Sequence, residues 1–329
     1  MIITRTPFRM SFVGGGSDLP SFYLNESGRV ISTTINKYMY VSIHKKFFKN
    51  IRVNYSQTEE VDDITKIKHP IIREILKYMK INDDIEISSL ADIPSKGSGL
   101  GSSSSYCVGL LNALHLYKKI KLSKKELAEK AFMIESKMCD EPGGKQDQYA
   151  ASFGGIKEYT FNPDNSVNVE AINVSNDNFE KLSQSILMFY TGMTRKSSLP
   201  LHDVIENINN NKKNIDTIRI MSSLCHDFKD NMINGDIQAL GEILDKNWQL
   251  KRSLSKIVSS DDIDELYKKA LKFGAFGGKI LGAGNGGFLM FIVPKDKCAS
   301  VKEALSNLKS VDIKFEKSGS QQVLNDNYE

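Results

Sequence analysis

The chain of 329 residues lacks the features that mark membrane-spanning and secreted proteins. Its longest unbroken apolar run, Phe288–Val293, is far too short to cross a bilayer, which takes about 20 apolar residues. The first residues carry no apolar stretch of the kind that begins a secretory signal, since Arg5, Pro7 and Arg9 interrupt them. We therefore expect a cytoplasmic protein with no membrane partner.

Cysteine is scarce, and so is an excess of either charge. The four cysteines are far apart and show no spacing typical of a metal site or a redox pair, which predicts free thiols in a reducing compartment. The 44 basic residues nearly balance the 40 acidic ones and leave a net charge of +4. The lysine pairs at 118–119 and 124–125 are interpreted as solvated helix faces, so we expect no nucleic-acid partner.

The order of the predicted elements favours an α+β protein with two domains, for which the length is sufficient. The first third reads as short strands with one helix, over Ile2–Thr6, Arg9–Val13, Val30–Ile35, Tyr38–His44, Ile51–Tyr55, Pro70–Met79 (the helix) and Ile85–Leu90. Long helical segments follow at roughly 200–232, 236–257 and 262–273, and a last strand is expected at Val311–Glu316. We place the domains at 1–180 and 181–329.

A glycine- and serine-rich stretch is the most informative part of the chain. Residues 94–105 read Pro-Ser-Lys-Gly-Ser-Gly-Leu-Gly-Ser-Ser-Ser-Ser, and a helical pattern of apolar residues follows at once. Glycines let the backbone approach a ligand closely, and a helix start offers unpaired N–H groups to an anion. The stretch therefore predicts a loop that binds nucleotide phosphates, with a serine hydroxyl available to Mg²⁺. A flexible linker would not run into a patterned helix, and the usual P-loop is excluded because no lysine follows Gly101.

Two further glycine-rich segments lie near the ends of the chain. In residues 9–20, three glycines follow a strand that ends at Val13, and Asp18 then offers an acceptor suited to sugar hydroxyls. A simple turn with Asp18 as a helix cap is the alternative. Residues 279–288 formally contain the dinucleotide-binding pattern Gly-x-Gly-x-x-Gly, but a strand follows where that pattern requires a helix. A glycine-rich hairpin is the alternative there.

Together the three segments resemble the three motifs of the GHMP kinases (galacto-, homoserine, mevalonate and phosphomevalonate kinases), in the family's order. The second motif, Pro-x-x-x-Gly-Leu-Gly-Ser-Ser, is met from Pro94 to Ser103 if one extra residue is allowed after the proline. The third, Lys-x-x-Gly-Ala-Gly-x-Gly-Gly, begins at Lys279, and Arg9 precedes Asp18 by nine positions as in GHMP sugar kinases. The form Gly-Gly-Gly-Ser-Asp-Leu-Pro looks most like the heptose-phosphate kinase branch and more distantly like the fucokinase branch.

The resemblance implies the GHMP kinase fold, with an N-terminal domain similar to ribosomal protein S5 and a ferredoxin-like C-terminal domain. It implies ATP-dependent phosphorylation of the anomeric 1-hydroxyl of D-glycero-D-manno-heptose 7-phosphate, a step similar to one in bacterial nucleotide-activated heptose synthesis for surface polysaccharide. The implied ATP contacts come from one loop, namely Lys96, Gly97, Ser98, Gly99, Leu100, Gly101, Ser102, Ser103 and Ser104.

The resemblance also assigns roles around the acceptor. Ser103 and Glu135 would hold Mg²⁺, Asp147 would take the proton of the acceptor hydroxyl, and Arg9 would orient Asp147. Taken alone, Glu135 could be a surface residue and Asp147 a helix cap, but their interval of twelve residues fits the family. The sugar contacts are expected from Gly14, Gly15, Gly16, Ser17, Asp18 and Gly284, with Arg195 favoured for the 7-phosphate because its planar fork binds phosphate bidentately. Other candidate cations are Lys37, Lys145 and Lys196.

Three alternatives stay open at this point. Another sugar 1-kinase of the fucokinase type would share nearly every motif. A mevalonate- or homoserine-type kinase would differ in the first motif. A non-catalytic homologue that senses a ligand is expected to have lost Asp147, Glu135 or Ser103, all of which are present. The sequence leaves the oligomeric state and the choice between ATP and GTP open.

Overall fold

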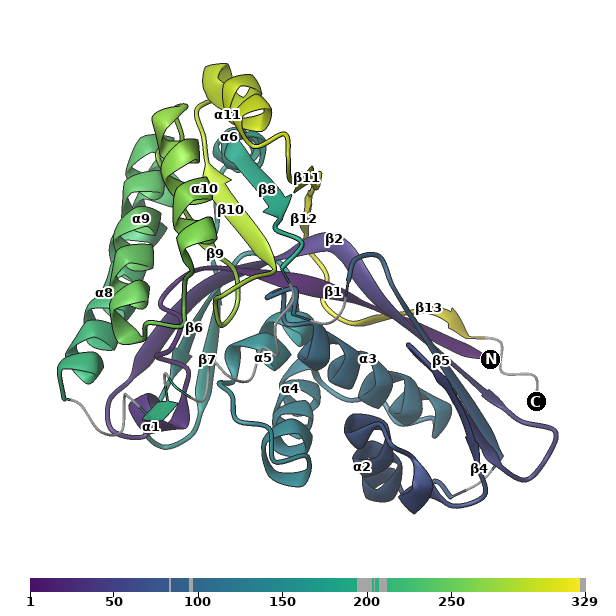
Figure 1. Ribbon diagram of the computed structural model, residues 1–329. Coiled ribbons are helices and arrows are strands. Elements are labelled where there is room, and N and C mark those ends of the chain that lie inside the picture. Colours follow the sequence, from purple (N-terminus) through teal and green to yellow (C-terminus); the bar gives the residue numbers. More distant parts are fainter. Residues whose placement is uncertain (83, 95–96, 194–202, 204, 207–211, 326–329) are drawn as a thin grey trace.

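The computed structural model describes residues 1–82, 84–94, 97–193, 203, 205–206 and 212–325, which form two β-sheets flanked by helices (Figure 1). The larger sheet has nine strands in the order β13-β1-β2-β5-β3-β4, with β6 and β12 also paired to β2 and β7 paired to β6. These strands are β1 (Ile2–Val13), β2 (Gly28–Lys45), β3 (Ile51–Asn54), β4 (Thr58–Val61), β5 (Ile85–Ala91), β6 (Lys157–Phe161), β7 (Val167–Ala171), β12 (Phe315–Glu316) and β13 (Gln321–Asn325). The expected α+β class is confirmed.

Two long antiparallel strands, β1 and β2, run the length of the larger sheet. The sequence predicted each of them as two shorter strands, but their pairing extends from Ile2 opposite Ile43 to Val13 opposite Ile31. The register shifts between Pro7 and Phe8, where a proline that cannot donate a ladder hydrogen bond is accommodated at an irregularity instead of ending the strand.

Helices α3 (Ser102–Tyr117) and α5 (Gln146–Phe153) pack on this sheet. Helix α2 (Pro70–Met79) packs against α3, and α4 (Lys124–Met133) packs against α3 and α5. Helix α3 lies against β1 and β2 and buries Leu110, Leu111 and Leu114 completely (Figure 1). Helix α4 begins at the predicted capping box, in which Ser123 and Glu126 each accept a hydrogen bond from the other's backbone N–H. A π-helical turn, η2 (Ile134–Met138), continues it. Such turns are frequent at functional sites.

The second half of the chain builds a four-stranded sheet in the order β11-β8-β10-β9. Its strands are β8 (Ile186–Tyr190), β9 (Gly277–Ile280), β10 (Phe288–Ile292) and β11 (Lys309–Ser310). The longer helices around it are α8 (Lys212–Asn234), α9 (Ile237–Leu254) and α10 (Asp261–Lys272), and the shorter ones are α6 (Asn176–Ser185) and α11 (Cys298–Ala304). Trp248 of α9 is fully buried in this half. Short helical turns also occur at α1 (Pro20–Tyr23), η1 (Ile64–Lys66) and η3 (Lys295–Lys297).

The C-terminal segment corrects one expectation. The single strand predicted over Val311–Glu316 is wrong, because Lys309–Ser310 pairs with β8 while Phe315–Glu316 pairs with β2 of the other sheet. The chain then adds β13 beside β1, which brings both ends of the described chain together (Figure 1). The last two strands, β12 and β13, thus belong to the larger sheet. The domain boundary at residue 180 stays a prediction. The four cysteines are free thiols, and no helix among the described residues is long and apolar enough to cross a membrane.

Candidate active site

A cleft of about 1380 Å³ lies between the two halves of the chain, and all three glycine-rich segments line it. The second and third segments touch through their backbones. A Cβ on Gly99, whose φ is +75°, would lie 2.1 Å from the carbonyl oxygen of Leu281, and one on Gly282 would lie 2.4 Å from the Cα of Gly99. These positions need glycine both for the left-handed backbone and for the close approach. Segments separated by about half of the chain thus form one wall of the cleft.

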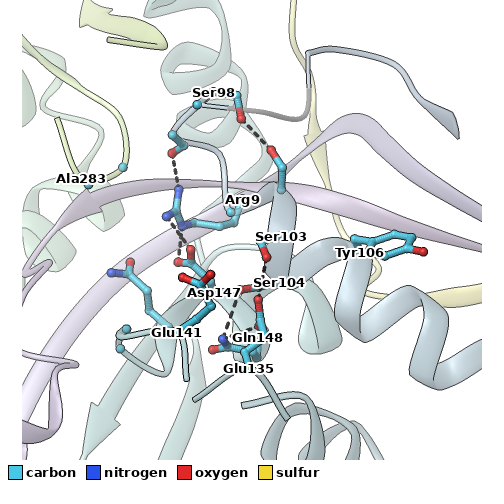
Figure 2. A pocket seen from close by; sticks show the side chains of 18 of the residues that line it. Arg9, Ser98, Ser103, Ser104, Tyr106, Glu135, Glu141, Asp147, Gln148 and Ala283 are labelled. Atoms are coloured by element: carbon cyan, nitrogen blue, oxygen red, sulfur yellow. Dashed lines mark hydrogen bonds and ion pairs between the residues drawn. The ribbon is translucent and has the colours of Figure 1, made fainter. Parts of the chain in front are cut away.

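An ion pair between β1 and α5 lies in the centre of the cleft (Figure 2). Arg9 donates from Nε to Asp147 Oδ1 at 2.7 Å and from Nη2 to Oδ2 at 2.9 Å. Its Nη1 donates to the carbonyl oxygen of Gly99 at 2.7 Å. The Arg9 side chain is 5% exposed and that of Asp147 is 24% exposed, so the carboxylate faces the cleft from a buried support. Bidentate pairing fixes its plane.

Asp18 lies beside this pair and is held by backbone and amide groups. Its Oδ1 accepts from Gly16 N at 3.0 Å and from Gln146 Nε2 at 3.2 Å, while Oδ2 faces Gln146 N at 3.3 Å. A Cβ on Gly144 would lie 1.8 Å from Oδ2, which explains a glycine there. Burial and the nearby charge of Asp147 raise the pKa of Asp18. The carboxyl is thus rigid and suited to bind a polar ligand.

A third carboxylate, that of Glu135 in η2, contacts the first turn of α3. Its Oε1 accepts from Ser103 Oγ at 3.0 Å, and its Oε2 accepts from Gln148 Nε2 at 2.7 Å (Figure 2). Burial raises its pKa to about 7, although hydrogen bonds from Gln148, Ser104 and Ser103 oppose the rise. The Oε1 atom of Gln148 is buried without a hydrogen-bond partner among the described residues. A carboxylate, a hydroxyl and an unpaired amide oxygen match the oxygen ligands that Mg²⁺ prefers, so these residues fit that ion.

The loop before α3 has the geometry of an anion site. Gly101 caps the helix with φ +69°, and Ser105 N makes the first backbone bond of the helix, to Gly101 O. The N–H groups of the preceding serines therefore have no intrahelical partner, and the helix dipole adds positive potential. Ser98 Oγ lies 2.6 Å from Ser102 Oγ and ties the loop to the helix. Ser102 and Ser103 both line the cleft.

The remaining predicted site residues lie in different places. Gly15 and Gly16 line the cleft, whereas Gly14, Ser17 and Gly284 support the turns behind it. The Ser17 hydroxyl lies 2.8 Å from the carbonyl oxygens of both Gly14 and Arg29, either of which can accept its hydrogen bond. Lys145 donates to Asn165 at 2.7 Å and 2.6 Å and so is already engaged. Lys96, Arg195 and Lys196 lie outside the described residues.

Sequence reasoning missed several groups in the cleft. Gln146 and Gln148 flank Asp147, which had already been identified from the sequence, so their position beside it was a usable signal. Lys251 of α9 lies in an ordinary helix with no motif around it. At the far end of the cleft the rings of Tyr55 and Tyr106 contact that of His69, with centroids 4.8 Å and 5.3 Å apart. These ring faces suit a flat aromatic base.

Comparison with known families gives two matches. The GHMP kinases N terminal domain matches residues 66–155, and the GHMP kinases C terminal domain matches residues 228–310.

Individual relatives span nearly the whole chain. A D-glycero-alpha-D-manno-heptose 7-phosphate kinase from Campylobacter jejuni is 30% identical, over 97% of either chain. A bifunctional fucokinase/GDP-fucose pyrophosphorylase from Arabidopsis thaliana is 24% identical over 94% of this chain and 31% of its own length. The crystal structure of a D-glycero-D-manno-heptose 1-phosphate kinase from Bacteroides thetaiotaomicron superposes with a TM-score of 0.80 at 24% identity, covering 99% of both chains. That likeness confirms the expected fold.

Proposed function

Because this chain belongs to the GHMP kinase family and is a sugar kinase of it, we propose that it transfers the γ-phosphoryl group of ATP to the anomeric hydroxyl of a heptose 7-phosphate. The observation that carries the proposal is the placement of Asp147 and Asp18 side by side, next to the phosphate-binding loop and in contact with Gly99 through Arg9. An acceptor hydroxyl and the end of a triphosphate would meet there.

Asp147 is the group we assign to the proton of the acceptor hydroxyl. Each of its oxygens accepts one hydrogen bond from Arg9, at 2.7 Å and 2.9 Å, and keeps a second lone pair for a ligand. Because Arg9 fixes the carboxylate plane, the hydroxyl oxygen would be held in line with the phosphoryl group that it attacks. Positioning of this kind is the main source of catalysis in phosphoryl transfer.

On the donor side, the loop and the α3 N-terminus would bind the phosphates through backbone N–H groups. Ser103 and Glu135 would hold Mg²⁺, which when bound neutralises phosphate charge. The family uses ATP as its phosphate donor, and the tyrosine and histidine rings at the far end of the cleft would take the base.

On the acceptor side, Asp18 would bind ring hydroxyls from a position fixed by Gly16 and Gln146. The choice of a heptose 7-phosphate rests on the Campylobacter jejuni relative. Arg195 stays our proposed cation for the 7-phosphate.

The Arabidopsis thaliana relative supports the fucokinase-type alternative, in which the acceptor carries no phosphate. A ligand sensor is disfavoured because Ser103, Glu135 and Asp147 lie together in one cleft with intact hydrogen bonds.

The test is a kinase assay of the purified protein against heptose 7-phosphate, the unphosphorylated heptose, fucose, galactose and mevalonate. Phosphorus NMR of the product then identifies the oxygen that received the phosphoryl group. Preference for heptose 7-phosphate with an anomeric phosphate product supports the proposal. Preference for an unphosphorylated sugar refutes the substrate and favours the fucokinase-type reading. If the phosphorylated sugar is preferred and Arg195→Ala keeps that preference, only the assignment of Arg195 is wrong.

A further inference from the structure

Lys251, near the end of α9, is the one lysine of that helix among the residues that line the cleft. It belongs to none of the three glycine-rich segments. Its Nζ donates a hydrogen bond to the carbonyl oxygen of Gly282, in the loop that touches Gly99 of the phosphate-binding loop. The ammonium group therefore lies where the loop for the donor phosphates meets the carboxylates that face the acceptor.

The charged groups that face Lys251 come from four elements. They are Arg9 of β1, Asp18 in the loop after β1, Asp147 of α5 and Lys279 of β9. Arg9 and Asp147 neutralise each other, and Lys279 is buried with its Nζ 2.8 Å from the carbonyl oxygen of Phe12. Among the described residues, no carboxylate lies within ion-pair distance (4.0 Å) of Lys251 Nζ. Burial with an adjacent arginine lowers the pKa of Lys251 to about 8.

A largely buried ammonium group without a carboxylate partner is unfavourable in the free protein. When protonated, Arg9, Lys251 and the buried Lys279 repel one another at one corner of the cleft, so this corner is suited to an anion.

Arg9 and Lys251 both line the cleft and could donate to such an anion, but they differ in how many N–H groups remain free. Arg9 uses Nε, Nη1 and Nη2 for Asp147 and Gly99, whereas Lys251 uses one of three N–H bonds, for Gly282. Lysine is a compact charge that can follow a moving group.

Building on the proposed kinase activity, we propose that Lys251 binds the phosphoryl group while it is in transit between ATP and the acceptor. It would donate to a non-bridging oxygen of that group. The new bond joins the acceptor oxygen to phosphorus as the bond from phosphorus to the β-phosphate oxygen breaks. The hydroxyl proton goes to Asp147, ADP leaves with the electron pair of the broken bond, and Lys251 keeps its proton throughout. It is thus a further catalytic residue, supplied by the second half of the chain.

The test compares Lys251→Met and Lys251→Arg with Lys246→Met, which removes an exposed lysine from the same helix. The acceptor is whichever sugar the wild-type protein phosphorylates fastest. We expect Lys251→Met to lower kcat by about 10²–10³-fold, as for loss of one preorganised donor, with the KM for ATP nearly unchanged. Lys251→Arg should restore much of kcat, and Lys246→Met should match wild type. In wild type kcat/KM, which reports the free protein, should fall as the pH rises through about 8, and Lys251→Arg should move that fall to higher pH.

A second measurement needs no acceptor. Aluminium fluoride with ADP and Mg²⁺ mimics the phosphoryl group in transit, so it should tighten ADP binding to wild type and Lys246→Met but not to Lys251→Met. ADP alone should bind all three equally. The proposal is wrong if Lys251→Met keeps kcat within about threefold of wild type, or if it weakens ADP alone as much as the fluoride complex. If wild type prefers an unphosphorylated sugar, the proposed substrate is wrong. Both measurements still test the role of Lys251 in that case.

Discussion

Replacing Glu135 by glutamine should stabilise the metal-free protein at alkaline pH while it destroys activity. Glu135 is buried, and its pKa rises from the usual 4.5 to about 7. In the unfolded chain the group ionises near 4.5, so between these pH values the folded state binds more protons than the unfolded state. The raised pKa therefore costs stability, which is lost as the pH rises from 4.5 through about 7. The difference corresponds to about 3 kcal/mol.

Glutamine keeps the shape of the side chain and its contact with Ser103, but it is never ionised. Glu135→Gln should therefore have a higher free energy of unfolding than wild type at pH 8, by up to about 3 kcal/mol, and nearly the same value at pH 4.5. Chemical denaturation in EDTA at both pH values measures this. Glu180→Gln, which changes an exposed glutamate of α6, is the control and should show no such dependence. An equal stability of Glu135→Gln and wild type at pH 8 would refute the reasoning, because the burial penalty would then be absent.

Three other variants test the rest of the cleft. Asp147→Asn should cut turnover by about 10²–10⁴-fold and leave ADP affinity nearly unchanged, by steady-state kinetics and calorimetry; turnover near the wild-type value would remove Asp147 from the mechanism. Asp18→Ala should raise the KM for phosphorylated and unphosphorylated sugars alike by about tenfold or more while the KM for ATP stays constant, since it loses hydrogen bonds to ring hydroxyls only. Gly99→Ala should lose at least about 1–2 kcal/mol of stability and weaken ATP binding, because its φ is +75° and its Cβ would lie 2.1 Å from Leu281 O; unchanged melting and ATP affinity would show that the two loops do not touch.

The sequence predicted those parts of the site that depend on local backbone chemistry. Alternating glycines before four serines indicated a loop that ends in a helix, and α3 begins at Ser102. The pattern Ser123 to Glu126 fixed the start of α4 in the same way. For Glu135 and Asp147, spacing alone left a surface residue or a helix cap as alternatives, and only the likeness to GHMP kinases separated them.

What the sequence could not predict depends on contacts between distant segments. The strand β13 is largely exposed and buries no apolar side chain, and it forms because its backbone pairs with β1, more than 300 residues earlier in the chain. From local sequence alone, Pro7 predicted a break between two strands. The break does not occur because the partner strand β2 pairs with β1 on both sides of the irregularity. Lys251 has neighbours typical of any amphipathic helix, and only the approach of Gly282 and Arg9 makes it unusual.

The cleft holds its ionisable groups in unfavourable states until ligands arrive. Burial raises the pKa values of Glu135 and Asp18, and it lowers those of Lys251 and Lys279, so acids and bases are both driven toward their neutral forms. A dry, apolar pocket would be expected to contain no such groups, because each one reduces the stability of the free protein. In the proposed reaction, a triphosphate with a divalent cation would bring both signs of charge into the same space. The cation would favour the ionised Glu135, and the phosphates would favour the protonated Lys251. Binding energy would therefore be used partly to restore these charges next to the reacting atoms, which is the arrangement that stabilises charge developing in phosphoryl transfer.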